Sequence, residues 1–325
     1  ECLPPFAFAL CNFELGRLEC FRHALKAVIR EENHDDDGAL LLWIPLLRNV
    51  IDNHDLTQWA FNVIFTRCWK YAPDEDNDNA KDDQIDFDRS DIVPLGDMFN
   101  HQEPGNVVVQ DLSSQAYVDF VLTEDTSTSS PLYLSYGMTN PYRFLIIFGF
   151  VYPEMPEIFC QVLYAHPSEE LLNLGCNDRS KMVYRTQDGA IANAVWDTVL
   201  YSLLAQVPDV QSQFYQACME NPDIKEKIHR KYRLEVCLTL RNHVLRTLNE
   251  LDEYSDKTNL YLQQQQQQQQ QHKDKGEDTP HSRLLMIRNH IDFLQSTFQK
   301  VKERLDRMAS DEKDLRMKNK SKESS

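Results

Sequence analysis

Four short segments of the chain carry the residue types from which a chemical site could be assembled. They are Arg67 within the run FTRCW, the run PLGDMFNH at 94–101, Tyr136-Gly137 at the end of an apolar strand, and FGFV at 148–151. Taken singly, each has an ordinary structural explanation, because Asn-His pairs usually lie in turns and Tyr-Gly pairs usually end strands. A shared chemistry therefore requires that the fold bring these distant segments together.

In this order and spacing the segments resemble a SET-domain methyltransferase. More narrowly, they look like the class of the Rubisco large-subunit lysine methyltransferase and the related actin-histidine methyltransferase, since VPLGDMFNH is followed about 35 residues later by LSYG. The resemblance is good over 56–152 and extends weakly to about residue 254. It implies an α+β protein, with a SET-type β fold and knot-like threading over 1–155 and an α-helical substrate-binding lobe over 156–325.

The resemblance also implies a role for each matched residue. The expected cofactor is S-adenosyl-L-methionine, and the residues expected to bind it are Arg67, Asp97, Asn100 and His101. Tyr136 is the expected catalytic residue, with its hydroxyl at the point of methyl transfer. The residues expected along the substrate channel are Gly96, Trp69 and Phe148. The expected partner is a protein substrate that bears a lysine, and no metal ion is required in this class.

The expected chemistry suits these residue types. Methyl transfer from a sulfonium to an amine is an in-line displacement, which needs a neutral, aligned amine more than a strong base. A narrow apolar channel beside a positive charge lowers the pKa of a lysine by desolvation and like-charge repulsion. Tyr136 would aim the amine, and its hydroxyl oxygen would hold the polarised methyl group through weak C–H···O contacts.

Two positions refine the expected product. Gly96 stands where the histidine-methylating relative has Trp, and a small residue there resembles the lysine enzymes. Phe148 stands where the family has a second Tyr, and the loss of that hydroxyl predicts more than one methyl group per lysine. The sequence therefore favours lysine over histidine as the target.

The amino-terminal part departs from the family. The first SET strands of the family carry a glycine-containing segment that clasps the cofactor, whereas residues 1–55 hold only Gly16 and Gly38, in helical or polar settings. The chain begins with Glu1 and not with Met, as an amino-terminally truncated sequence would. Two alternatives to lysine methylation therefore stay open: a non-catalytic SET-fold module that binds proteins, and a protein-histidine methyltransferase.

The composition narrows the class of protein. The 34 Lys and Arg against 51 Asp and Glu give a net charge of −17, which argues against direct nucleic-acid binding because phosphates need a basic face. A hydrophobic fraction of 42% can fill a core, and no apolar run is long enough for a membrane-spanning helix. The eight cysteines lack C-x-x-C spacing, so we expect reduced thiols and an intracellular protein, with cytoplasm, nucleus and plastid not distinguished.

Periodicity and turn residues predict the order of the elements. Helices are expected over 20–30, 56–71, 191–206 and 221–254, and short strands over 92–95, 107–110, 116–122 and 132–135. The acidic run 73–91 is expected to be a mobile insertion, and it fails the calcium-loop pattern at Asn79 and Ile85. The glutamine run at 263–271 predicts a disordered insertion over about 257–282.

An apolar stripe marks the last part of the chain. From Leu284 to Met308 apolar residues alternate three and four positions apart, which is an a/d heptad repeat on one helix. The stripe has two interpretations. It is either the inner face of a terminal helix that docks on the helical lobe, or a coiled-coil surface for a partner helix over 284–308.

Overall fold

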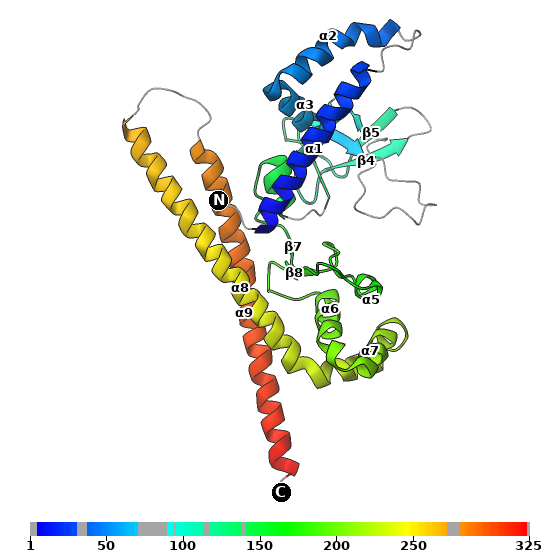
Figure 1. Ribbon diagram of the computed structural model, residues 1–325, viewed down its shortest axis with the longest axis vertical. Helices are drawn as coiled ribbons and strands as arrows, with labels where there is room; N and C mark the ends of the chain where they lie inside the picture. The colour runs from blue at the N-terminus through cyan, green and yellow to red at the C-terminus, as the bar shows by residue number, and fades with distance from the viewer. Residues whose placement is uncertain are drawn as a thin grey trace. The chain divides into compact units, whose positions relative to one another are not determined.

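The computed structural model describes residues 5–30, 38–70, 90–93, 95–112, 117–137, 141–271 and 280–323. Over these ranges the protein has the predicted α+β composition, with long helices and small sheets (Figure 1). The chain divides into two compact units, which we name the sheet unit, residues 10–139, and the helical unit, residues 140–325 with the first nine residues. The division thus falls earlier than residue 155, where the sequence placed the domain boundary.

The sheet unit begins with helices and continues into two small sheets. Its helices are α1 (Pro5–Arg30), which starts in the helical unit, α2 (Gly38–Asp52) and α3 (His54–Arg67). Strands β1 (Cys68–Lys70) and β2 (Ser90–Ile92) pair in antiparallel. The second sheet has the strand order β3-β6-β4-β5, with β3 (Asn100–His101), β4 (Val107–Leu112), β5 (Tyr117–Leu122) and β6 (Tyr133–Leu134).

The three helices of the sheet unit share a small apolar core. Leu18, Ile51 and Phe61 are each at most 7% exposed, and the rings of Phe21 and Phe61 lie 5.7 Å apart. The Asn53 side chain accepts a hydrogen bond from the Leu56 N–H at 3.1 Å, which caps the start of α3. Helix α2 was not predicted, and α1 starts well before residue 20, because helices in proteins are stabilised mostly by tertiary packing and not by local propensity.

The helical unit holds the longer elements. In chain order they are α4 (Pro141–Arg143), a π-helical turn (Phe144–Phe148), β7 (Glu157–Phe159), α5 (Glu169–Asn173), β8 (Val183–Arg185), α6 (Asn193–Leu203), a 3-10 turn (Leu204–Gln206), α7 (Pro208–Glu220), α8 (Pro222–Gln271) and α9 (Pro280–Glu323). Asn221 caps α8 by accepting a hydrogen bond from the Ile224 N–H at 3.1 Å, and Pro222 occupies the first turn. This confirms the predicted start of that helix.

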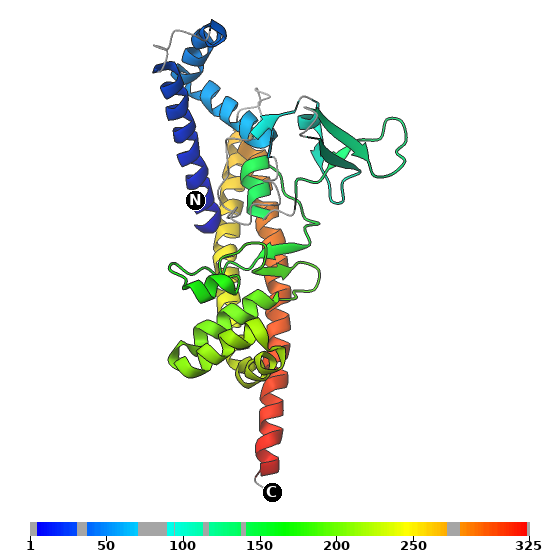
Figure 2. The same cartoon turned by 90° about the vertical axis from the view of Figure 1, so that its right-hand side faces the viewer.

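Helices α8 and α9 lie side by side in both views and form the spine of the helical unit (Figures 1 and 2). The central residues of the predicted stripe are fully buried: Ile291, Leu294, Phe298, Val301 and Leu305 are each 0% exposed. The interpretation as a terminal helix docked on its own lobe is therefore confirmed. The alternative, a coiled-coil surface for a partner helix over 284–308, stays a prediction, although this chain itself covers Ile291 to Leu305.

The glutamine run requires a correction. Helix α8 does not end near residue 254 but continues through the glutamines to Gln271, so residues 257–271 are helical and not a disordered insertion. Glutamine is a good helix former, and extending a formed helix needs no new nucleus. Leu262, only 7% exposed, and Thr258, fully buried, also hold this part of α8 to the unit. Residues 272–279 lie outside the described part of the chain, as do 71–89, which include most of the predicted acidic insertion.

Candidate functional site

The short strands β3 and β6 bring the distant sequence motifs together. They pair in parallel, with Asn100 opposite Tyr133 and His101 opposite Leu134. The Gln102 N–H adds a hydrogen bond to the Leu134 carbonyl at 3.2 Å. The chain that leaves β6 therefore passes directly beside the turn that contains the Asn-His pair.

Tyr136 makes two hydrogen bonds to this turn. Its hydroxyl donates to the Phe99 carbonyl oxygen at 2.6 Å, and its main-chain N–H donates to Nδ1 of His101 at 3.1 Å. The rings of His101 and Tyr136 lie 5.2 Å apart. The expectation that the turn at 97–101 and Tyr136 share one place in the fold is confirmed, although 35 residues separate His101 from Tyr136.

The protonation of the two side chains follows from their surroundings. Partial burial lowers the pKa of His101, and the nearby Glu103 carboxylate offsets part of that effect. The imidazole is therefore neutral near pH 7, accepts at Nδ1 and carries its proton on Nε2. Partial burial raises the pKa of Tyr136 although Arg67 pulls it down, so the phenol keeps its proton.

A protonated phenol in this position can orient a ligand but cannot act as a base. The Tyr136 O–H donates to the Phe99 carbonyl, and a phenol oxygen that donates one hydrogen bond can also act as an acceptor. It could accept from an amine N–H or from a polarised C–H group. The site can thus align two reactants, which is what an in-line displacement requires.

Arg67 and Gly96 both constrain the turn at 97–101, Arg67 through a hydrogen bond and Gly96 through close packing. The Arg67 guanidinium is exposed and donates to the main-chain carbonyl oxygen of Asp97. Gly96 is buried, and a Cβ there would come 2.1 Å from Cζ of Phe120. The space beside Gly96 is therefore filled by Phe120, whose ring also packs on Phe99 at 5.0 Å. The close approach of Phe120 is by itself a sufficient reason for a glycine at position 96, whether or not a substrate channel runs beside it.

Leu95 and Met98, both within the run 94–101, add an exposed apolar surface to the site that sequence analysis did not anticipate. Leu95 has a φ of 71°, a left-handed conformation that is costly for a leucine, and its side chain is 82% exposed. The Met98 side chain is 66% exposed, and Asn100 next to it is exposed as well. Nothing in the sequence distinguishes a leucine with positive φ, so only the structure reveals this exposed apolar surface.

Trp69 belongs to the other small sheet of the sheet unit, and Phe148 belongs to the helical unit. The Trp69 main chain pairs with Asp91 in the β1–β2 sheet, and its side chain lies outside the described residues. Phe148 belongs to the helical unit, where it ends the π-helical turn. Its ring packs on Phe144 at 5.8 Å and on Phe150 at 6.3 Å, in an aromatic cluster of that unit.

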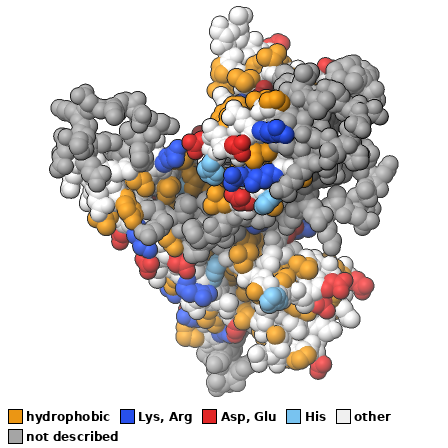
Figure 3. Space-filling view, turned by 45° about the horizontal axis from the view of Figure 1, so that its top comes forward, with side chains coloured by type: hydrophobic (Ala, Val, Ile, Leu, Met, Phe, Trp, Pro, Cys, Tyr) orange, Lys and Arg blue, Asp and Glu red, His pale blue; other side chains and the backbone are white. Residues whose placement is uncertain are grey.

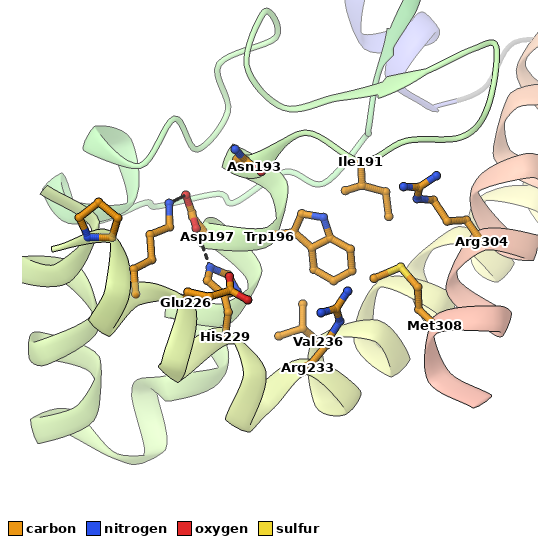
Figure 4. Close-up of a pocket in the computed structure, with 12 residues that line it drawn as sticks. Ile191, Asn193, Trp196, Asp197, Glu226, His229, Arg233, Val236, Arg304 and Met308 are labelled. Atoms are coloured by element: carbon orange, nitrogen blue, oxygen red, sulfur yellow. Dashed lines mark hydrogen bonds and ion pairs between the residues drawn. The ribbon is translucent and has the colours of Figure 1, made fainter. Parts of the chain in front are cut away.

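A second polar cluster, in the helical unit, was not anticipated (Figure 4). The Asp197 carboxylate on α6 accepts from Lys225 Nζ at 2.6 Å and contacts His229 Nε2 at 2.8 Å, both on α8. The only sequence signal is that Lys225 and His229 are one helical turn apart. That Asp197 is their partner is known only from the structure, because the packing of α6 on α8 brings it next to Lys225 and His229.

Charges elsewhere are mixed. On the face drawn in Figure 3, acidic and basic side chains lie among apolar ones over the described residues. In the ranges that the structure describes, no group of three His, Cys, Asp or Glu side chains could hold a metal ion. None of the helices traced in those ranges is both long and apolar enough to cross a membrane.

Comparison of the chain with models of known protein families and with curated proteins found no match.

Proposed function

We propose that the protein is an S-adenosylmethionine-dependent methyltransferase that acts on a lysine side chain of a protein substrate. The observation that carries this proposal is the 2.6 Å hydrogen bond from the Tyr136 hydroxyl to the Phe99 carbonyl, next to the Asn100-His101 pair. The SET-type fold with knot-like threading is part of the same proposal. It rests on the resemblance of the motifs together with the parallel pairing of β3 and β6.

The residues around the turn fit such a cofactor. Strand β3 is at the edge of its sheet, so one row of its backbone groups faces away from the ladder and could pair with an adenine edge. The exposed side chains of Leu95 and Met98 beside it offer an apolar surface for a ring. The cofactor would supply the electrophilic methyl group on its sulfonium.

In this proposal Tyr136, His101 and Arg67 each have a distinct role. Tyr136 presents oxygen lone pairs that orient the amine and the methyl group, and it does so without taking a proton. His101 fixes the main chain of Tyr136 through Nδ1. Arg67 holds the turn at the Asp97 carbonyl, which keeps the following residues in place for cofactor binding.

One observation favours a second candidate, a non-catalytic SET-fold module that binds proteins. Where the family carries its glycine-containing cofactor strands, this chain has α1 and α2, and both are helices over their described residues. A protein without that half of the pocket would keep the turn but bind the cofactor poorly. A histidine methyltransferase remains a third candidate, distinguished from the first only by the modified residue.

Cofactor binding and methyl transfer separate these candidates. Titration calorimetry with S-adenosylmethionine should show saturable binding to the full chain, and labelled methyl groups should appear on lysine in a protein lysate. Tyr136→Phe should lower methyl transfer about 100-fold or more and change cofactor affinity little, because a positioned catalytic group contributes mainly to the reacting geometry.

Tyr215→Phe is the matched control, since it removes the hydroxyl that accepts from Asn173 at 2.8 Å in the helical unit. Methyl transfer by this variant should equal that of the unchanged protein. If Tyr136→Phe transfers methyl groups at the unchanged rate, Tyr136 has no catalytic role. An absence of cofactor binding would favour the non-catalytic module, and label on histidine would identify the third candidate.

A further inference from the structure

A pocket in the helical unit carries basic side chains that the proposed methyl-transfer site does not use (Figure 4). It is formed by α6 and the residues just before it, together with facing stretches of α8 and α9, and has a volume of about 360 Å³. Pockets that take small ligands or side chains begin at about 300 Å³. The lining residues that matter here are Trp196, Asp197, Lys225, Arg233, Arg304 and Met308.

One wall of the pocket is already neutralised. The Asp197 side chain is 9% exposed and is held by Lys225 and His229 at 2.6 Å and 2.8 Å. Glu226 beside them pairs with Arg230 at 3.2 Å. The acidic side chains of this wall are therefore already paired within the protein.

The other side of the pocket carries two arginine side chains. Arg233 from α8 and Arg304 from α9 enter on the side farther from Asp197 (Figure 4). Among the described residues neither guanidinium forms an ion pair, whereas Arg241 and Arg316 on the same two helices each pair with a carboxylate. In a chain with a net charge of −17, two such guanidiniums in one pocket mark a place where an anion would be attracted.

We propose that this pocket binds an acidic peptide segment. A carboxylate of the segment pairs with Arg233 and Arg304, because a guanidinium presents a fork of donors that matches a carboxylate. A neighbouring apolar side chain packs on the half-buried Trp196 and on Met308. Since Arg233 is exposed, the pocket is open to solvent, and the rest of a peptide can run out of it. This binding stands whether or not the chain transfers methyl groups.

The first experiment uses two peptides and the full chain without cofactor. The probe is acetyl-Gly-Glu-Phe-Glu-Gly-amide, and its matched control has Gln in place of both Glu residues. Isothermal titration calorimetry should show binding of the acidic peptide and at least tenfold weaker binding of the neutral one. The binding should weaken as salt is raised, because the paired charges are partly exposed. Equal affinity for the two peptides, or no binding of either, overturns the proposal.

The second experiment locates the binding. Arg304→Gln should weaken binding of the acidic peptide about tenfold. Arg307→Gln is the matched control, because Arg307 is an exposed residue of the same helix that does not line the pocket. Equal weakening by the two variants would place the peptide elsewhere and overturn the proposal. Benzoate, titrated as a small aromatic carboxylate, should bind at least tenfold more weakly than the peptide, and equal affinity would refute a peptide as the ligand.

Discussion

His290 on α9 is a buried imidazole whose removal should make the protein less sensitive to acid. Its side chain is 0% exposed, and neither ring nitrogen has a hydrogen-bond partner in the described part of the chain. Its ring packs edge-on against the Tyr142 ring, with the two ring centroids 4.8 Å apart. Burial lowers the pKa of His290 from 6.5 to about 4, because the charged form would lose its hydration.

The sign and size of the effect follow from linkage. The folded-state pKa lies below that of the unfolded chain, so the unfolded state binds more protons between pH 6.5 and about pH 4. Stability is therefore complete above pH 6.5 and falls as the pH is lowered through this window. Because a tenfold difference in proton affinity corresponds to about 1.4 kcal/mol, His290 alone should lower the unfolding free energy by about 2–3 kcal/mol between about pH 7.5 and about pH 4.5.

The test is urea unfolding followed by far-ultraviolet circular dichroism, which reports chiefly on α8 and α9. His290→Leu keeps the volume and removes the titrating group, so its loss of stability between the two pH values should be smaller by about 2 kcal/mol. Some acid sensitivity should remain, because burial also lowers the pKa of His243. His166→Leu, at an exposed position, is the control and should behave as the unchanged protein. An equal loss for His290→Leu and the unchanged protein would refute the reasoning.

Two further pairs of variants test packing and charge burial. Gly96→Ala should lower the unfolding free energy of the sheet unit by about 1–3 kcal/mol in a thermal melt, because a Cβ would collide with the Phe120 ring. Gly16 on α1 is the control: it faces open space, so Gly16→Ala should leave the stability unchanged or raise it slightly in the same melt. Asp197→Asn should lower stability by about 3 kcal/mol, because the partly buried Lys225 ammonium would stay without a counter-charge. Asp188→Asn, which breaks an exposed pair, should lower it by less than about 1 kcal/mol, and similar urea midpoints for the two Asp variants would contradict this ranking.

Local pattern was enough to predict several elements of this protein. The a/d repeat on 284–308 indicated a long helix with one buried face, and Ile291 to Leu305 are indeed buried against the helical unit. The Asn221-Pro222 pair marked the start of α8 because capping and the fixed φ of proline act within one turn. The β-prone runs near 107–110 and 116–122 likewise became the antiparallel pair β4–β5. In each case the residues that decide the structure are neighbours in sequence.

Only part of the candidate site could be predicted from the sequence. The order of the motifs nominated Tyr136 and His101, and the parallel pairing of β3 with β6 places them in contact. The acceptor of the Tyr136 hydroxyl, however, is a main-chain carbonyl at Phe99, which has no signature in a sequence. The lack of room for a side chain at Gly96 is likewise due to Phe120, a residue of β5 that is distant in sequence.

The extent of α8 and the environment of His290 were decided by tertiary structure alone. Glutamines have no strong preference against a helix, so packing of residues such as Leu262 on the rest of the unit determines whether they continue α8. His290 sits beside an apolar stripe, yet its burial depends on Tyr142, nearly 150 residues earlier. Short-range pattern sets which faces are apolar, whereas pKa values, close contacts and uncompensated charges arise between segments that only the folded chain brings together.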